Sequence, residues 1–125
     1  IMNVYIAVAI GGAIGAMMRY GVSQYIVDKG VLYPWGTVVV NLLGSLLIGF
    51  GMAYIEGHPH VSPWVKLLCM TGFLGGLTTF STFIFEGYML QEKGLAHMLS
   101  YMGGQIILGY GLCWLAFTVG KRMWG

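Results

Sequence analysis

The chain has 125 residues, of which 58% are hydrophobic and only 8% are charged. Soluble domains carry roughly 25% charged residues, so too few charges are present here to keep a globular surface in water. A net charge of +2 without a basic cluster excludes a nucleic-acid binder. Two cysteines in apolar runs exclude a secreted disulfide scaffold. The composition therefore predicts an integral membrane protein.

Four long apolar stretches divide the chain, approximately residues 2–27, 32–55, 65–90 and 95–120. An α-helix needs about 20 apolar residues to cross a hydrocarbon core of about 30 Å. Backbone polar groups in lipid must be hydrogen-bonded, so the helix is the expected spanning form. The sequence predicts an all-α membrane protein with four transmembrane helices, forming a single domain over residues 1–125.

The basic residues that flank these stretches do not set a direction of insertion. Three of these residues fall on the side of the membrane that holds the termini: Lys66, Lys121 and Arg122. Three fall on the other side: Lys29, Lys93 and Arg19. Arg19 counts only if it lies at the end of its helix. Because orientation follows the excess of Lys and Arg in short loops, two interpretations stay open. Either one loop charge decides weakly, or the chain inserts both ways up, which would make an antiparallel two-fold dimer the natural assembly.

Polar residues within the spans are candidate functional groups, because polar side chains are costly in a membrane. Thr37, Asn41 and Ser45 are spaced four apart and share one helix face, as do Tyr101 and Gln105 in the fourth span. An unpaired buried amide costs roughly 2–7 kcal/mol, whereas an interhelical hydrogen bond returns only about 0.6–2 kcal/mol. Asn41 is therefore interpreted as part of a transport pathway, with packing between helices as the alternative.

The third span is the most informative segment. Gly75 and Gly76 each weaken a helix by about 1 kcal/mol, and four hydroxyl residues follow within residues 78–82. This pattern predicts a helix break in mid-membrane, where freed carbonyl groups suit a hard cation such as Na⁺. Phe80 and Phe83 are three apart, so their positive ring edges could face an anion together. Ordinary packing is the alternative for both rings.

Three segments carry a family resemblance: residues 11–20, residues 35–45 and the run from Gly72 to Phe83. Together they resemble the small fluoride channels, the Fluc or CrcB-like family. The resemblance implies a passive fluoride-selective channel that exports cytoplasmic fluoride and lowers its toxicity, and not an enzyme. It also implies an antiparallel dual-topology homodimer with two pores, in the bacterial cytoplasmic (inner) membrane.

The same resemblance implies roles for individual residues. The ion pathway would comprise Phe80, Phe83, Asn41, Ser81, Thr82 and Tyr101, with Arg19 in a vestibule. A structural Na⁺ at the dimer centre would be bound by the backbone carbonyls of Gly75 and Thr78.

A small four-helix multidrug or cation antiporter with dual topology is the competing interpretation. Proton-coupled export requires a carboxylate deep within a helix. The four acidic residues are all assigned to connections or their neighbourhood: Asp28, Glu56, Glu86 and Glu92. Their positions weigh against the antiporter. A membrane scaffold protein would explain the glycines but not the polar third span.

Two further patterns bear on packing and chemistry. Gly11 with Gly15, and Gly72 with Gly76, have the four-residue spacing that allows close helix packing, more often within a chain than between chains. His58 and His60 flank a proline in a loop and are too sparse for a metal site, so they are expected to be solvated. This sparseness is a further reason to expect no enzyme.

Overall fold

A computed structural model describes residues 3–125, so the predicted span 2–27 begins just outside the described range. The described chain is helical throughout. In order, its elements are α1 (Val4–Asp28), α2 (Trp35–Gly57), α3 (Pro63–Lys66), the π-helical segment η1 (Leu67–Leu74), α4 (Gly75–Leu77), α5 (Ser81–Gln91) and α6 (Leu95–Trp124).

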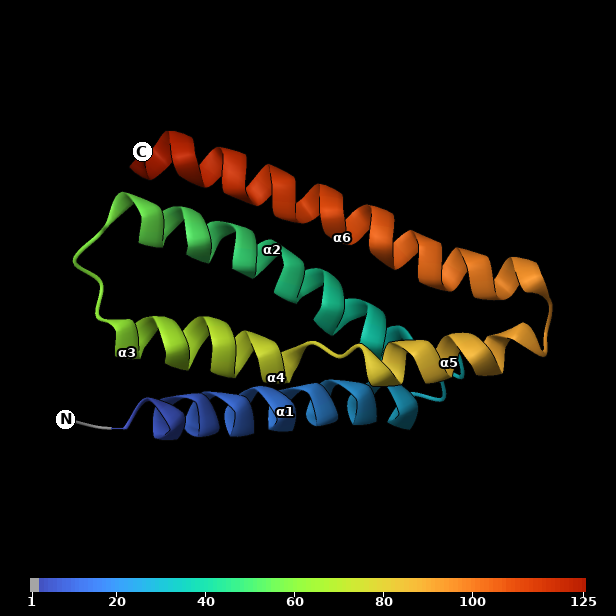
Figure 1. The fold of residues 1–125 in the computed structure, drawn as a ribbon. Coiled ribbons are helices and arrows are strands. Elements are labelled where there is room, and N and C mark those ends of the chain that lie inside the picture. The colour runs from blue at the N-terminus through green and yellow to red at the C-terminus, as the bar shows by residue number, and fades with distance from the viewer. Residues whose placement is uncertain (1–2) are drawn as a thin grey trace.

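These elements form four units that are long and apolar enough to cross a membrane: Val4–Asp28, Trp35–Gly57, Pro63–Gln91 and Leu95–Trp124. The third unit is composite, because α3, η1, α4 and α5 follow one another along it (Figure 1). An all-α protein with four potential transmembrane spans is therefore confirmed.

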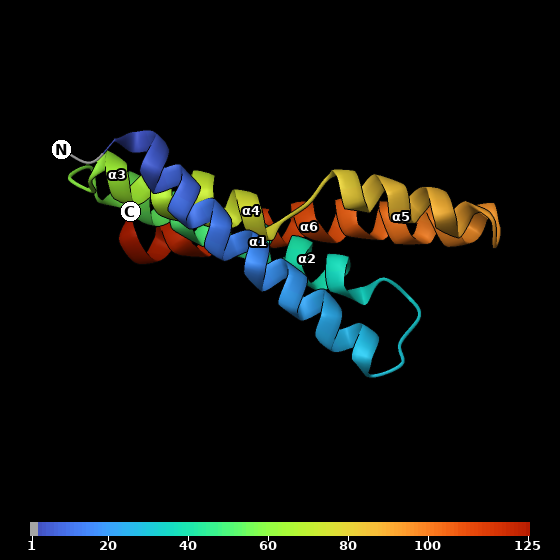
Figure 2. The same ribbon diagram turned by 90° about the horizontal axis from the view of Figure 1, so that it is seen from below.

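The spans are arranged so that both chain ends and the α2–α3 connection lie at one end of the molecule (Figure 1). The α1–α2 and α5–α6 connections lie at the opposite end. Helix α2 packs mainly along α6, while α1 packs along η1 and α4. Figure 2 shows α1 running obliquely to α5 and α6.

Local sequence explains where the spans begin and turn. The Asn3 side chain accepts a hydrogen bond from the Tyr5 backbone N–H at the start of α1 (2.8 Å). Ser62 caps α3 in the same way, with Pro63 in the first turn. Gly30 and Gly94 have positive φ angles of 78° and 133°, which permits the tight turns after α1 and before α6.

Close contact between α1 and the third span depends on glycine. A Cβ atom on Gly72 would lie 2.8 Å from the Val8 carbonyl oxygen, and one on Gly15 would collide with the Phe73 carbonyl oxygen. A Cβ on Gly76 would lie 3.0 Å from the Gly12 Cα atom. The two pairs of spaced glycines thus bring helices of the same chain together.

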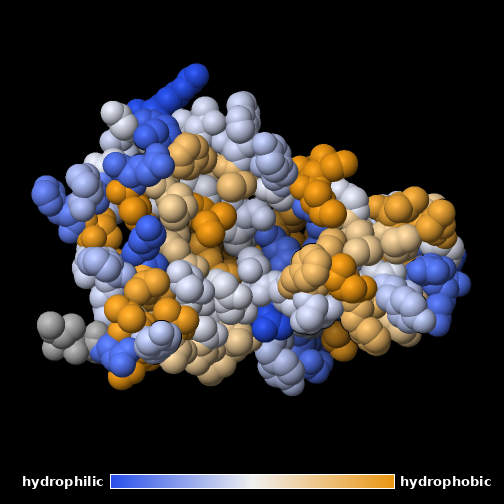
Figure 3. All heavy atoms as spheres, viewed as in Figure 1, coloured by the Kyte–Doolittle hydropathy of each residue, from blue (hydrophilic) through white to orange (hydrophobic). Residues whose placement is uncertain are grey.

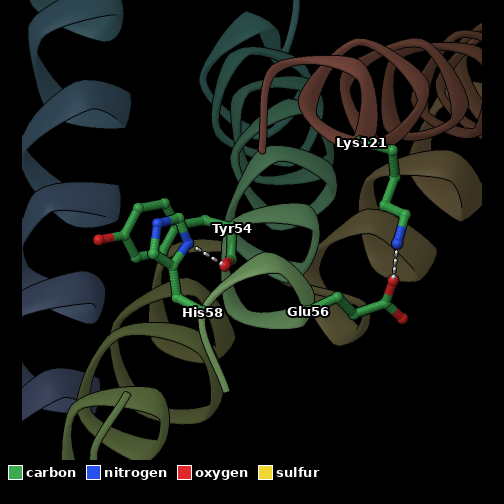
Figure 4. A network of polar contacts seen from close by, with 4 residues as sticks. All are labelled: Tyr54, Glu56, His58 and Lys121. Atoms are coloured by element: carbon green, nitrogen blue, oxygen red, sulfur yellow. Dashed lines mark hydrogen bonds and ion pairs between the residues drawn. The ribbon is translucent and has the colours of Figure 1, made fainter. Parts of the chain in front are cut away.

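The end of the molecule that holds the termini carries a small polar network (Figure 4). Lys121 Nζ lies 3.0 Å from Glu56 Oε2 and joins the ends of α2 and α6. His58 stacks on the Tyr54 ring at 4.0 Å between centroids, with its Nδ1 atom 2.8 Å from the Tyr54 carbonyl oxygen. His60 is exposed, as expected for a solvated residue, whereas His58 is partly exposed.

The surface has the distribution that a membrane environment requires. On the face drawn in Figure 3, hydrophilic residues gather towards the two ends, with smaller hydrophilic patches between them. Hydrophobic residues cover much of the remaining surface. Many large apolar side chains are exposed on the single chain, which suits contact with lipid or with another protein chain.

Candidate functional site

The candidate site is built around an interruption of the third span between α4 and α5. Helix α4 ends at Leu77, Thr78 has an extended backbone (φ −87°, ψ 161°), and α5 begins at Ser81. Figures 1 and 2 both show this non-helical connection. The interruption follows the two glycines and contains two of the four hydroxyl residues singled out in the sequence.

Two amides near the interruption donate to side chains instead of helical carbonyls. Thr79 N–H donates to Asn41 Oδ1 (2.8 Å), although its partner in an α-helix would be the Gly75 carbonyl. Thr82 N–H donates to Thr79 Oγ1 (3.2 Å), although its helical partner would be the Thr78 carbonyl. The carbonyls of Gly75 and Thr78 have therefore lost their helical donors.

The Asn41 amide holds the interruption from α2. It accepts from the Thr79 N–H, and its Nδ2 group donates to the Thr79 carbonyl oxygen (3.1 Å), so one side chain pairs with both backbone groups of one residue. Asn41 Nδ2 also donates to Gln105 Oε1 on α6 (3.1 Å). Three spans therefore meet at this amide.

A hollow of about 340 Å³ with both polar and apolar lining opens beside Asn41. Its lining comes from α2 and the third span: Asn41, Gly44, Ser45, Ile48, Met70, Thr71, Leu74, Gly75 and Thr78. Both residues predicted to bind a cation through their carbonyls line this hollow. Gly44 allows Thr78 to approach, because a Cβ atom there would collide with the Thr78 methyl group.

The two phenylalanines predicted for the pathway differ in their surroundings. Phe80 is 74% exposed in the single chain, whereas Phe83 is 6% exposed. Their ring centroids lie 6.1 Å apart, and Phe83 stacks on Tyr101 at 5.9 Å. Tyr33, in the α1–α2 connection, meets Tyr101 edge-on at 5.7 Å and lies 4.8 Å from the Trp35 ring. Burial raises the pKa of the Tyr33 phenol, which favours its neutral form.

Glu86, predicted in or near a connection but inside the predicted span 65–90, lies within α5, which continues to Gln91. Its Oε1 atom accepts a hydrogen bond from the Tyr101 hydroxyl (2.7 Å). Its spacing of three from Phe83 was the available signal, since both residues contact Tyr101 from one helix face.

Arg19 lies inside α1 and not at a helix end, so the condition for counting it with the basic residues of the connections is not met. Its Nε group donates to the Gly76 carbonyl oxygen (3.0 Å), in the last turn of α4. Among the basic residues near the connections, the count becomes three against two. They are Lys66, Lys121 and Arg122 at the end with the termini, and Lys29 and Lys93 at the other end.

The remaining predicted residues lie around the same interruption. Ser81 is the exposed first residue of α5, and Thr82 follows it half-buried. The structure thus brings Asn41 together with the segment from Gly75 to Thr82, while Phe83 and Tyr101 stack beside it. The contacts to Thr79 and Gln105 join residues 38 and 64 positions apart, which no local pattern indicates.

A helical chain with four apolar spans and a polar, interrupted third span belongs to the class of multi-pass membrane proteins. The chain belongs to the CrcB-like protein, Camphor Resistance (CrcB) family, which it matches over residues 6–117.

Curated relatives in this family extend over almost the whole chain. The protein named "Fluoride-specific ion channel FluC" of Aquifex aeolicus is 40% identical over 124 residues, covering 98% of this chain and 100% of the relative. Proteins of the same name from Acidobacterium capsulatum and Cupriavidus pinatubonensis are 38% identical over 121 residues and 43% identical over 108 residues. These cover 95% and 82% of this chain, and 97% and 86% of the respective relatives. The relatives are named as channels, so the family assignment is not to an enzyme.

Proposed function

We propose that the chain is a passive fluoride-selective channel that exports cytoplasmic fluoride and so lowers its toxicity. Two relatives named as fluoride-specific ion channels match nearly the whole chain over nearly their own full length, which supports this function. The observation that carries it is the interruption of the third span, where hydroxyl and aromatic residues gather beside the Asn41 amide.

Conduction must replace the water that fluoride loses, because a small anion is strongly hydrated. Ser81 and Thr82 supply hydroxyl groups at the first turn of α5, where the helix N-terminus carries a partial positive charge. The edges of Phe80 and Phe83 add weakly positive C–H groups. Asn41 supplies an amide further along the path. Tyr101 contributes its ring, stacked on Phe83, while its hydroxyl donates to Glu86. Such lining groups select ions without a formal charge in the pore.

We place Arg19 at a vestibule, although its Nε group is already hydrogen-bonded to Gly76. The guanidinium group has further N–H donors that can attract an anion from solution. Its fixed positive charge would raise the local concentration of fluoride without forming a tight site.

Assembly as an antiparallel dual-topology homodimer, with two pores, belongs to the same proposal. Exposure of Phe80 in the single chain supports it, because a second chain would cover this ring and complete the path. The near balance of basic residues at the two ends supports insertion in both orientations. For this function the protein would reside in the bacterial cytoplasmic (inner) membrane.

A structural Na⁺ is proposed at the centre of this dimer. Two observations on Gly75 and Thr78 support the fit. The N–H groups that would bond their carbonyls in an α-helix donate to side chains instead. Both residues also line the same hollow. Carbonyl oxygens are suitable ligands for a hard cation. A bound cation would supply positive potential near the anion path.

The antiporter alternative is not favoured. Its relatives would be expected among cation exporters, whereas the matched relatives are named fluoride channels. Glu86, the carboxylate within α5, already accepts a hydrogen bond from Tyr101.

Fluoride efflux from liposomes that contain the purified protein tests the function. We expect rapid fluoride release that needs no proton gradient, measured with a fluoride electrode, and no comparable release of chloride. Release of fluoride no faster than from protein-free liposomes would contradict the proposal, and so would transport that depends on a proton gradient.

A further inference from the structure

The hydrogen-bonding capacity of the Asn41 amide is fully used within the chain. A primary amide has two N–H donors, and here one reaches the Thr79 carbonyl and the other reaches Gln105 Oε1, both at 3.1 Å. An anion that is to bind Asn41 must therefore displace one of these acceptors. The Thr79 bond is one half of a two-point contact, since Thr79 N–H donates back at 2.8 Å. The bond to Gln105 is a single contact, and it is the one that can be exchanged.

Gln105 is held in a defined orientation on α6. Its side chain is 7% exposed, and its Nε2 group donates to the Tyr101 carbonyl oxygen one turn earlier (3.3 Å). This bond turns Oε1 toward Asn41, because a flipped amide would place two donors against each other. The carbonyl oxygen of Gln105 is consequently the acceptor that the Asn41 donor meets when no ion is present.

The Asn41–Gln105 bond lies between two hollows of the molecule. Asn41 lines the hollow of about 340 Å³ beside the interruption. Gln105 lines a second hollow of about 160 Å³, together with Tyr101 and Tyr33. An ion that passes from one hollow to the other would meet this bond.

We propose that Gln105 Oε1 acts as a resident acceptor that an anion must replace at Asn41 Nδ2, and that this exchange makes Gln105 a determinant of the fluoride concentration at which the path is occupied. The inference rests on the proposed channel function. In the empty path, the pairing avoids an unsatisfied buried donor, which is costly. When fluoride arrives, a neutral hydrogen bond is replaced by a charge-assisted one, which is roughly twice as strong. Chloride is larger and a weaker acceptor, so it gains less from the same exchange.

A purely structural role for this bond makes a different prediction. If Gln105 only joined α2 to α6, its loss would lower stability or reduce the flux of every anion alike. As a resident acceptor, it competes with fluoride for the Asn41 donor, so its loss should lower the fluoride concentration that gives half-maximal flux. That concentration therefore separates the two roles.

The experiment compares liposome efflux of fluoride and chloride for the wild-type chain and three variants. Gln105→Met keeps length and volume but removes the competing acceptor, so the fluoride concentration for half-maximal flux should fall by about tenfold, the worth of one hydrogen bond of about 1.4 kcal/mol. Gln105→Glu keeps an acceptor and adds a negative charge, so it should not lower that concentration. Tyr110→Phe is the control on the same helix, because Tyr110 is 76% exposed and lines neither hollow. It should leave both fluxes unchanged.

A spectroscopic measurement on the wild-type chain keeps the inference testable even if a variant does not fold. The three glutamines are Gln24, Gln91 and Gln105, and the first two are exposed. In protein with isotope-labelled glutamine, fluoride should shift one carbonyl infrared band to higher frequency, and chloride should not. No fluoride-dependent shift, or an unchanged half-maximal fluoride concentration in folded Gln105→Met, would overturn the inference. If the wild-type chain itself released no fluoride, the proposed function would fail instead.

Discussion

At the scale of single residues, Asn41 combines two demands that usually conflict. Its amide satisfies the backbone of Thr79, which an interrupted helix would otherwise leave unpaired in a membrane. The same amide lines a hollow beside the interruption and donates to an exchangeable partner on α6. A single side chain thus supports the fold and lies in the proposed path.

Replacing Asn41 should therefore affect stability before function is considered. In Asn41→Leu, the N–H and carbonyl of Thr79 lose their partners, so we expect a loss of about 1–3 kcal/mol for each orphaned group. Thermal unfolding in detergent would measure this loss. Ser45→Ala is the matched control, because the Ser45 hydroxyl bonds only to the Asn41 main-chain carbonyl (2.8 Å). Equal unfolding temperatures for the two variants would contradict the role given to the amide.

Phe80 and Phe83 should separate conduction from stability. Phe80→Ile and Phe83→Ile should both reduce fluoride flux severely, because apolar volume remains while the positive ring edge is lost. Only Phe83→Ile should also lower stability, by about 0.5–1.5 kcal/mol, because its buried ring stacks on Tyr101.

The control for both rings is Phe85→Ile, on the same helix and 62% exposed. It should keep the wild-type flux and the wild-type unfolding temperature. Wild-type flux in Phe80→Ile and Phe83→Ile would instead assign both rings to packing.

At the scale of secondary-structure elements, α1 and the third span pack so closely that their backbones are in contact at glycine positions. A Cβ atom on Gly15 would meet the Phe73 carbonyl oxygen and the Leu77 backbone nitrogen, and neither can move without shifting the third span. Gly15→Ala should destabilise the protein by about 1–3 kcal/mol through overpacking. In the same helix, Gly21 has no atom within 4 Å of its Cβ position. Gly21→Ala should be neutral or stabilising by up to about 1 kcal/mol. Thermal unfolding of the pair checks this, and similar temperatures would contradict it.

Features that depend on one segment alone could be predicted from the sequence, whereas contacts between residues on different spans could not. Long apolar stretches located the four spans, because burial in lipid acts on each segment separately. The partner of Glu86 could not be predicted, because its hydrogen bond to Tyr101 joins two different spans and makes a carboxylate tolerable inside a span. For Arg19, the Gly76 carbonyl has the same effect. The pairing of Asn41 with Thr79 was beyond sequence analysis, since nothing local links residues on different spans.

At the scale of the whole molecule, the proposed Na⁺ can be tested through the backbone. Thr78→Ser should keep the ion, because the ligand is a carbonyl and a serine hydroxyl can still donate to the Leu74 carbonyl as Thr78 does (2.9 Å). In Gly75→Ala, the added Cβ atom would have no neighbour within 4 Å in the single chain, and alanine favours a regular helix by about 1 kcal/mol. This variant should therefore bind Na⁺ more weakly. Fluoride flux of both variants, measured against sodium concentration, would show this difference. Full wild-type flux in strictly sodium-free solution would remove the ion from the proposal.

Orientation in the membrane is set by few charges, so it should respond to small changes. With three basic residues near the connections at one end and two at the other, the wild-type chain should insert both ways. Replacing Lys29 and Lys93 by neutral residues leaves three basic residues near the end with the termini and none near the other end, so all termini should face the cytoplasm. Replacing Lys66 and Arg122 leaves one basic residue near the end with the termini and two near the other end, which should favour the opposite orientation.

Labelling of a C-terminal tag in intact cells and in opened membranes measures each population. If the active unit is an antiparallel dimer, either variant alone should conduct little fluoride, because its partners all point the same way. Expressing the two variants together should restore the flux, since each supplies the orientation that the other lacks. Labelling of the wild-type tag from one face only, or full flux from one variant alone, would show that antiparallel pairing is not required.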